Sequence, residues 1–274
     1  MHIEHDKVLD GPLATALSMR DRNMVLLVRN ALKTRNVVLV FQPVVQARNA
    51  NLPAFYEGLI RVVDDTGRVI PAKEFIHYVE TLEEGRLLDT IALELGLSTL
   101  AANSAMRLSI NMSARSIGYP AWERALANAK AADPTILERL ILEITESSAM
   151  DMPDVVVEFM ANGQHEGITF GLDDFGAGYT AFRYFRDFSF DMVKIDKSFI
   201  RNIHSDADNQ VLTEALVLIA RQFDMFTVAE GVERVKDAEY LIDSGIDCLQ
   251  GFLFGAPRIT VRQPEAIDEH RKRA

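Results

Sequence analysis

Residues 139–174 read RLILEITESSAMDMPDVVVEFMANGQHEGITFGLDD. Each end carries a short apolar run, RLILEIT (139–145) and ITFGLD (168–173), which is too brief and too β-branched for a helix. Between them, residues 151–162 have helical character. A strand, a helix and a second strand in this order predict two parallel strands joined by a helical crossover.

The same pattern recurs on both sides of this stretch. Further candidate strands are VVLVFQ (37–42), AFYEGLIRVV (54–63), MRLSINM (106–112), DMVKID (191–196), FTVAE (226–230) and IDCLQGF (246–252). Further candidate helices are 83–103, 121–131, 206–223, 234–244 and a final segment from 261. Eight strands in one domain of about 250 residues favour an α/β barrel of the TIM type, (βα)8, over an open doubly wound sheet.

The first two strand candidates depart from this alternation. Only about a dozen residues separate them, including the turn-like ARNANLP, whereas a parallel crossover usually needs a dozen or more. We therefore expect an antiparallel first strand. Residues 12–35 are predicted to form a leading helix, so that 1–35 packs on a single barrel domain over 36–274.

Composition excludes several classes of protein. Among 274 residues, 48% are apolar and 25% charged, which is ordinary for a globular enzyme. The lone cysteine, Cys248, excludes an internal disulfide and a multi-cysteine metal site and favours a cytoplasmic setting. No apolar run approaches the roughly 18 residues of a membrane span, and MHIEHDKVLDG does not resemble a secretory signal. A net charge of −11 disfavours duplex nucleic acid as a partner.

Polar residues lie at or near the carboxyl ends of most candidate strands. They are Glu57, Asn111, Glu143 with Glu146 one turn beyond, Asp173 and Asp174, Lys194 and Asp196, Glu230, and Gln250. In a (βα) barrel these ends converge on the face where active sites are built. Any single acid has an alternative role as a helix N-cap, but such a succession of polar strand ends favours a shared site.

Carboxylates with one amide, and no histidine or cysteine, suit Mg²⁺ or Mn²⁺ better than zinc or copper. In the pair Asp173-Asp174, one carboxylate can bridge two metals while the other binds one. Two metals about 3.5–4 Å apart form a clamp for in-line displacement at phosphorus. Lys194 lies inside an apolar strand, where it either orients a metal-bound water or is simply a salt-bridged lysine.

The chain resembles an EAL domain, the family of cyclic di-GMP-specific phosphodiesterases. The blocks that carry the resemblance are FQPVV (41–45), EGL (57–59) followed by IR, LSINMSARS (108–116), LEITES (142–147), LDDFGAGYT (172–180), VKIDKSFI (193–200), AEGVE (229–233) and QGFLFGAP (250–257). Their order and intervals also fit the family, over nearly the whole chain.

The resemblance implies an eight-stranded barrel with an antiparallel first strand, and hydrolysis of cyclic di-GMP to linear pGpG with two Mg²⁺ or Mn²⁺ ions. Carried over position by position, one metal would be held by Glu57, Asn111, Glu143 and Asp173, and the other by Asp173, Asp174 and Glu230. Lys194 matches the residue that holds the attacking water, and Glu146 the glutamate that steadies the loop after the aspartate pair. The substrate pocket would be lined by Gln42, Leu59, Arg61 and Gln250. A homodimer is also implied.

The chain departs from the family pattern in three places. Gly58 replaces the alanine of the family name, Ala177 stands where threonine is common, and Val62-Val63 lacks a frequent tryptophan. We expect these changes to affect turnover rate rather than reaction type. The alternative functions are a cyclic di-GMP receptor that does not hydrolyse its ligand, a signalling partner that acts mainly through protein contacts, and a hydrolase of another phosphodiester. Receptors of this kind usually lose a metal ligand, and none is missing here.

Overall fold

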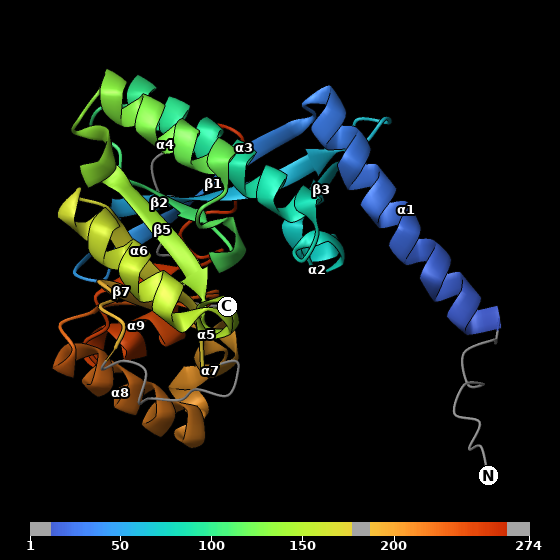
Figure 1. The fold of residues 1–274 in the computed structure, drawn as a ribbon. Coiled ribbons are helices and arrows are strands. Elements are labelled where there is room, and N and C mark those ends of the chain that lie inside the picture. Colours follow the sequence, from blue (N-terminus) through green and yellow to red (C-terminus); the bar gives the residue numbers. More distant parts are fainter. Residues whose placement is uncertain (1–11, 177–186, 262–274) are drawn as a thin grey trace, which may run out of the picture.

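The computed structural model describes residues 12–176 and 187–261, and within them eight strands close into a barrel wrapped by helices (Figure 1). The barrel strands are β1 (Val37–Gln46), β2 (Asn49–Val63), β4 (Leu108–Asn111), β5 (Leu140–Thr145), β6 (Thr169–Phe175), β7 (Met192–Ile195), β8 (Phe226–Ala229) and β9 (Cys248–Gln250). They follow the order β1-β9-β8-β7-β6-β5-β4-β2, and the pairing of β1 with β2 closes the ring. The predicted TIM-type barrel is confirmed.

Strand β1 runs antiparallel to both of its neighbours, as predicted. It pairs with β2 in a hairpin whose register places Gln42 opposite Glu57 and Val44 opposite Phe55. On its other edge it pairs antiparallel with β9, where Val44 lies opposite Gln250. The remaining barrel pairs are parallel, so the carboxyl ends of β2 and β4–β9 meet at one mouth.

In the described residues, the six longer helices lie close to their predicted positions, whereas three helices of four to six residues were not predicted. They are α1 (Pro12–Thr34), α2 (Ile76–Val79), α3 (Glu83–Ala102), α4 (Pro120–Ala132), α5 (Glu146–Asp151), α6 (Pro153–His165), α7 (Lys197–Ile200), α8 (Ala207–Gln222) and α9 (Val235–Asp243). The helix expected over 151–162 is α6, which begins at Pro153 because Met152 leaves helical geometry, and the short helix α5 precedes it. The helix expected from 261 lies outside the described residues. None of the helices in the described part of the chain combines the length and apolar character of a membrane crossing.

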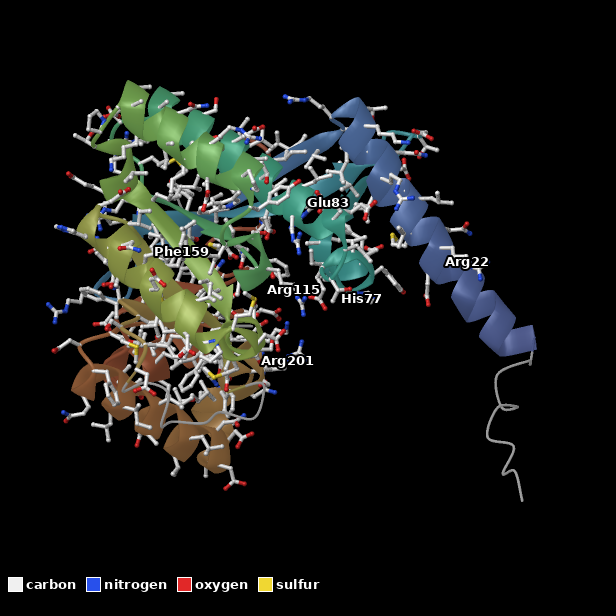
Figure 2. All side chains as sticks on the ribbon, viewed as in Figure 1. Arg22, His77, Glu83, Arg115, Phe159 and Arg201 are labelled. Carbon is white, nitrogen blue, oxygen red and sulfur yellow. The ribbon has the colours of Figure 1, made fainter. Side chains whose placement is uncertain are left out.

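The main core lies between the outer face of the barrel and its helices. Trp122 of α4 meets Phe159 of α6, and Phe159 meets Phe170 of β6, with ring centroids 5.6 Å apart and edge-to-face in both pairs. Phe159, labelled in Figure 2, thus joins two helices to the sheet. Such edge-to-face pairs add stability beyond their buried area.

A second, smaller core lies where the β1–β2 hairpin extends past the barrel. Strand β3 (Val69–Pro71) pairs with the end of β2, and α2 and the start of α3 pack beside it. Helix α1 contributes Val28 and Ala31 to this core, both buried. Toward its N-terminus α1 extends away from the barrel, and Arg22 on that part is exposed (Figures 1 and 2).

The barrel interior has an apolar floor below a polar layer. The floor consists of Val44, Phe55, Ile141, Met192 and Val228. Side chains alternate between the two faces of a strand, so the residue two positions nearer the mouth also points inward. On these five strands that residue is polar: Gln42, Glu57, Glu143, Lys194 and Glu230. The strand pattern therefore gathers the polar side chains just inside the mouth.

Candidate active site

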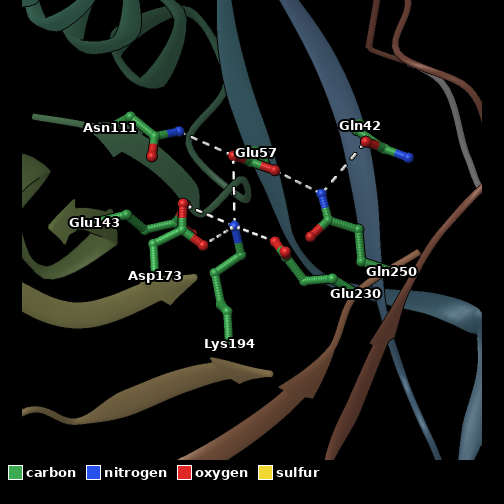
Figure 3. Close-up of polar contacts among 8 residues, drawn as sticks. All are labelled: Gln42, Glu57, Asn111, Glu143, Asp173, Lys194, Glu230 and Gln250. Carbon is green, nitrogen blue, oxygen red and sulfur yellow. Dashed lines mark hydrogen bonds and ion pairs between the residues drawn. The ribbon is translucent and has the colours of Figure 1, made fainter. Parts of the chain in front are cut away.

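The centre of the polar layer is the ammonium group of Lys194, which is 1% exposed (Figure 3). Its Nζ lies 2.7 Å from Glu230 Oε1, 3.0 Å from Glu143 Oε2, 3.0 Å from Asp173 Oδ1 and 3.5 Å from Glu57 Oε1. These four carboxylates come from four different strands or strand ends. One cation thus faces four acids at the bottom of the mouth.

Glu57 is held by two amide side chains. Asn111 Nδ2 donates a hydrogen bond to its Oε1 over 2.9 Å, and Gln250 Nε2 donates to its Oε2 over 2.5 Å. Gln250 Nε2 also lies 3.4 Å from Gln42 Oε1, and Gln42 Nε2 donates to the Gly255 carbonyl. Asn111 of β4 therefore holds one oxygen of Glu57, and the Gln42–Gln250 pair of β1 and β9 holds the other (Figure 3).

The electrostatics of the group are dominated by burial and crowding. Burial alone would lower the pKa of Lys194, but the surrounding carboxylates raise that pKa well above the usual lysine value. Burial raises the pKa of Glu143 well above its usual range, and it raises the pKa of Glu230 to about 8. For Glu57, burial acts to raise the pKa, yet Lys194 and the amide donors hold it below the ordinary value. One ammonium is thus too little positive charge for all the acids to ionise.

A β-bulge presents two adjacent carboxylates at the end of β6. Leu172 pairs with Val193 and Phe175 with Ile195, so Asp173 and Asp174 together stand opposite Lys194. Asp174 has φ +56°, a conformation that costs a non-glycine residue about 1–3 kcal/mol. Bulges commonly re-aim side chains beside active sites. Here the bulge brings both carboxylates of the pair to the mouth.

The acids form two overlapping groups of the size that a cation needs. The first acidic group is Glu57, Glu143 and Asp173, and the second acidic group is Asp173, Asp174 and Glu230. In each group, every residue offers one carboxylate oxygen, and these oxygens all lie within 4.8 Å of one another. If all five acids ionise, their charge with Lys194 is −4, which two divalent cations neutralise. Glu143 Oε1 is buried without a hydrogen-bond partner among the described residues. An orphaned buried oxygen in an all-oxygen donor set fits Mg²⁺ or Mn²⁺.

Two glycines allow close packing on the two faces of the barrel wall. A Cβ on Gly171, which pairs with Glu143, would lie 2.7 Å from Met192 Cε and 3.3 Å from Glu143 Cγ. On the opposite face of β2, a Cβ on Gly58 would lie 2.7 Å from Ile110 Cδ1 and 3.2 Å from the Ser109 carbonyl oxygen. The departure from alanine at position 58 therefore has a packing reason, because Ile110 occupies the space of the methyl group.

The other predicted site residues lie around the mouth. Leu59 and Arg61 are half-buried on the same face of β2 as Glu57, and Arg61 Nη1 donates to the Ile60 carbonyl. Glu146 is buried at the start of α5, but residues 177–186 of the loop that it was expected to steady, Ala177 included, lie outside the described residues. Asp196 accepts a hydrogen bond from Ser198 N and caps α7, the N-cap alternative for a strand-end acid.

Sequence reasoning missed the residues that hold the backbone beyond Asn111. Asp89 Oδ2 accepts hydrogen bonds from Ser113 N (2.9 Å) and Ser116 Oγ (2.6 Å), and Ser148 Oγ accepts one from Ala114 N (2.8 Å). The sequence feature that could have identified Asp89 is its position as an acid beside the apolar face of the helix that begins at Glu83.

The chain is similar to known proteins along most of its length. The family model of the EAL domain matches residues 27–257. The bifunctional diguanylate cyclase/cyclic di-GMP phosphodiesterase MucR of Pseudomonas aeruginosa is 30% identical over 84% of this chain and 34% of its own length. The cyclic di-GMP phosphodiesterase PdeR of Escherichia coli is 29% identical over 90% of this chain and 38% of its own length. The chain thus spans about a third of the length of these curated relatives.

Similarity to a solved structure covers the barrel itself. The PaMucR phosphodiesterase, in complex with c-di-GMP, has a TM-score of 0.74 and 29% sequence identity. The match covers 86% of this chain and 97% of that one.

Proposed function

The chain belongs to the EAL domain family, and on this premise we propose that it hydrolyses cyclic di-GMP to linear pGpG with two Mg²⁺ or Mn²⁺ ions. The observation that carries the proposal is the pair of overlapping acidic groups around Lys194. One ion would be held by the first acidic group with the oxygen of Asn111, and the other by the second acidic group. Asp173 belongs to both groups, so it would contribute to holding both ions.

In the proposed reaction, water adds to one phosphorus, one P–O3′ bond breaks and the leaving oxygen takes up a proton. Divalent cations, when bound, lower the pKa of water and stabilise the leaving oxygen. Lys194 stays protonated among the acids and can donate a hydrogen bond that orients the water. The amide pair Asn111 and Gln250 keeps Glu57 in a fixed orientation, which avoids reorganisation during the reaction.

The substrate would lie over the outer rim of the same site. Leu59 offers an apolar surface, and the guanidinium of Arg61 offers charge for a phosphate. Gln42 and Gln250 complete the rim on the β1 and β9 side, and Gln250 Oε1 is a buried acceptor without a partner among the described residues. A cyclic dinucleotide with two phosphates and two bases matches this mixture of polar and apolar groups.

The homodimer and a cytoplasmic location belong to the same proposal. Both come from the sequence: the first from the resemblance, and the second from the cysteine content. Light scattering of the purified protein measures the first directly, and a mass of one chain at micromolar concentration would contradict it.

The test of the function is product analysis by anion-exchange chromatography. Purified protein is incubated with cyclic di-GMP and Mn²⁺, Mg²⁺, Ca²⁺ or EDTA. We expect pGpG with Mn²⁺ or Mg²⁺ and none with EDTA. Ca²⁺ should suppress the reaction, because it prefers longer bonds and more ligands than Mg²⁺ does. Protein that binds the dinucleotide with Mn²⁺ and yields no pGpG would favour the receptor function instead.

A further inference from the structure

The backbone that follows Asn111 is anchored by three different elements. Met112 N donates to the Glu143 carbonyl of β5 over 2.9 Å. The next two amides donate to side chains: Ser113 N to Asp89 Oδ2 of α3, and Ala114 N to Ser148 Oγ of α5. Three consecutive N–H groups thus bind three elements, which leaves the end of β4 little freedom to move.

Asp89 makes the strongest of these anchors. A single carboxylate oxygen accepts both the Ser113 amide, at 2.9 Å, and the Ser116 hydroxyl, at 2.6 Å. No lysine, arginine or histidine of the described residues forms an ion pair with this carboxylate. Burial raises the pKa of Asp89 to about 6, so its charge is costly at this position. Two hydrogen bonds to one carboxylate oxygen nevertheless hold the backbone at Ser113 in place.

What this anchor places is Asn111, two residues before Ser113. Asn111 Nδ2 donates to Glu57 Oε1 over 2.9 Å, and its amide oxygen is the remaining ligand atom proposed for the first ion. We propose that Asp89 is a positioning residue that, through Ser113, holds Asn111 against Glu57 and so sets the affinity of the first acidic group for a divalent cation. This inference rests on the proposed function, because it takes the first acidic group as a cation site.

The test is Mn²⁺ binding by isothermal titration calorimetry without substrate. Substitutions beside a metal site typically cost about 10–100-fold in affinity. We expect Asp89→Ala to weaken Mn²⁺ binding at least 10-fold. Asp89→Asn keeps one carbonyl oxygen that can accept both hydrogen bonds, so its affinity should stay within about threefold of wild type.

The matched control is Asp247→Ala at the opposite end of the barrel. There too, one carboxylate oxygen accepts a backbone amide and a hydroxyl, from Thr227 N (2.9 Å) and Thr227 Oγ1 (2.8 Å). The lost hydrogen bonds are the same in kind, so Asp247→Ala should lose comparable stability. Its Mn²⁺ affinity should remain within about twofold of wild type, since it touches neither acidic group.

A folded Asp89→Ala protein with wild-type Mn²⁺ affinity would overturn the inference. If Asp89→Ala does not fold, Asp89→Glu decides, because the extra methylene displaces the carboxylate while keeping its charge. Wild-type affinity in Asp89→Glu overturns the proposal, and weakened affinity that Asp89→Asn does not share supports it. Wild-type protein that binds Mn²⁺ without hydrolysing cyclic di-GMP would refute the proposed function but leave this comparison intact.

Discussion

Removing the charge of Lys194 should destabilise the metal-free protein and leave the metal-bound protein much less affected. Lys194→Met deletes the cation between four acids, of which Glu143 is fully buried. Breaking a buried ion pair by removing one partner costs about 3–5 kcal/mol. For a domain of this size, each kcal/mol lowers Tm by about 2–4 °C, so we expect a loss of roughly 10 °C. Proton uptake by the remaining acids limits the loss, which should therefore be larger at pH 8 than at pH 6.

The assay is thermal unfolding by circular dichroism in EDTA and in Mn²⁺. Added Mn²⁺ replaces the missing positive charge and should recover most of the lost Tm. Turnover should stay about 100-fold or more below wild type, because the group that orients the water is gone. The control is Lys130→Met, which breaks a surface pair with Glu166 whose side chains are 47% and 41% exposed. Such a pair contributes about 0–1 kcal/mol.

A Lys194→Met protein that unfolds in EDTA within about 2 °C of wild type at pH 8 would refute this prediction. An equal rise in Tm on adding Mn²⁺ to variant and wild type would also refute it, because Mn²⁺ would then not be replacing the missing positive charge.

Three further predictions follow from contacts around the mouth. Glu57→Ala removes one acid of the first acidic group and should lower Mn²⁺-dependent turnover at least ~100-fold. Binding of cyclic di-GMP, measured by calorimetry, should persist. Wild-type turnover in this variant would contradict the role of Glu57 as a metal ligand. Gly58→Ala places a methyl group against Ile110 Cδ1 and should lower the free energy of unfolding in urea by about 1–3 kcal/mol. Adding Ile110→Val to the same chain should recover most of that loss. Additive losses from the two substitutions would refute the packing explanation. Burial raises the pKa of Asp89 from 3.8 to about 6, so the folded wild-type protein loses stability as the pH rises through that range and Asp89 loses its proton. Asp89→Asn has no such titration, so its free energy of unfolding minus that of wild type should increase between pH 4 and 7, by at most about 3 kcal/mol. A difference that does not change with pH would contradict the raised pKa.

Local pattern was enough to predict the barrel and its reversed first strand. The short spacing before Glu57 favoured a hairpin over a parallel crossover, and the structure has the expected hairpin. The candidate site was also predictable in outline, because a barrel gathers its strand ends at one face whatever the details of packing. The convergence of Glu57, Glu143, Asp173 and Glu230 on Lys194 follows from that topology.

Contacts between distant side chains were not predictable from the pattern. The hydrogen bond from Gln250 to Glu57 joins strands almost two hundred residues apart, and its direction depends on rotamers. The packing of Ile110 against Gly58 depends on the register between β2 and β4. Asp89 lies in the middle of a helix, where an acid ordinarily faces solvent, and only the folded loop shows its partners. These interactions depend on tertiary structure, so the sequence around each residue does not predict them.

The proposed function requires the two overlapping acidic groups to bind two divalent cations. Anomalous diffraction at the manganese edge, from crystals soaked in Mn²⁺, locates such ions directly. We expect two peaks inside the barrel mouth about 3.5–4 Å apart, one beside each acidic group, with Asp173 between them. A mouth without a manganese peak at a saturating Mn²⁺ concentration would show that the acidic groups do not form the proposed cation sites.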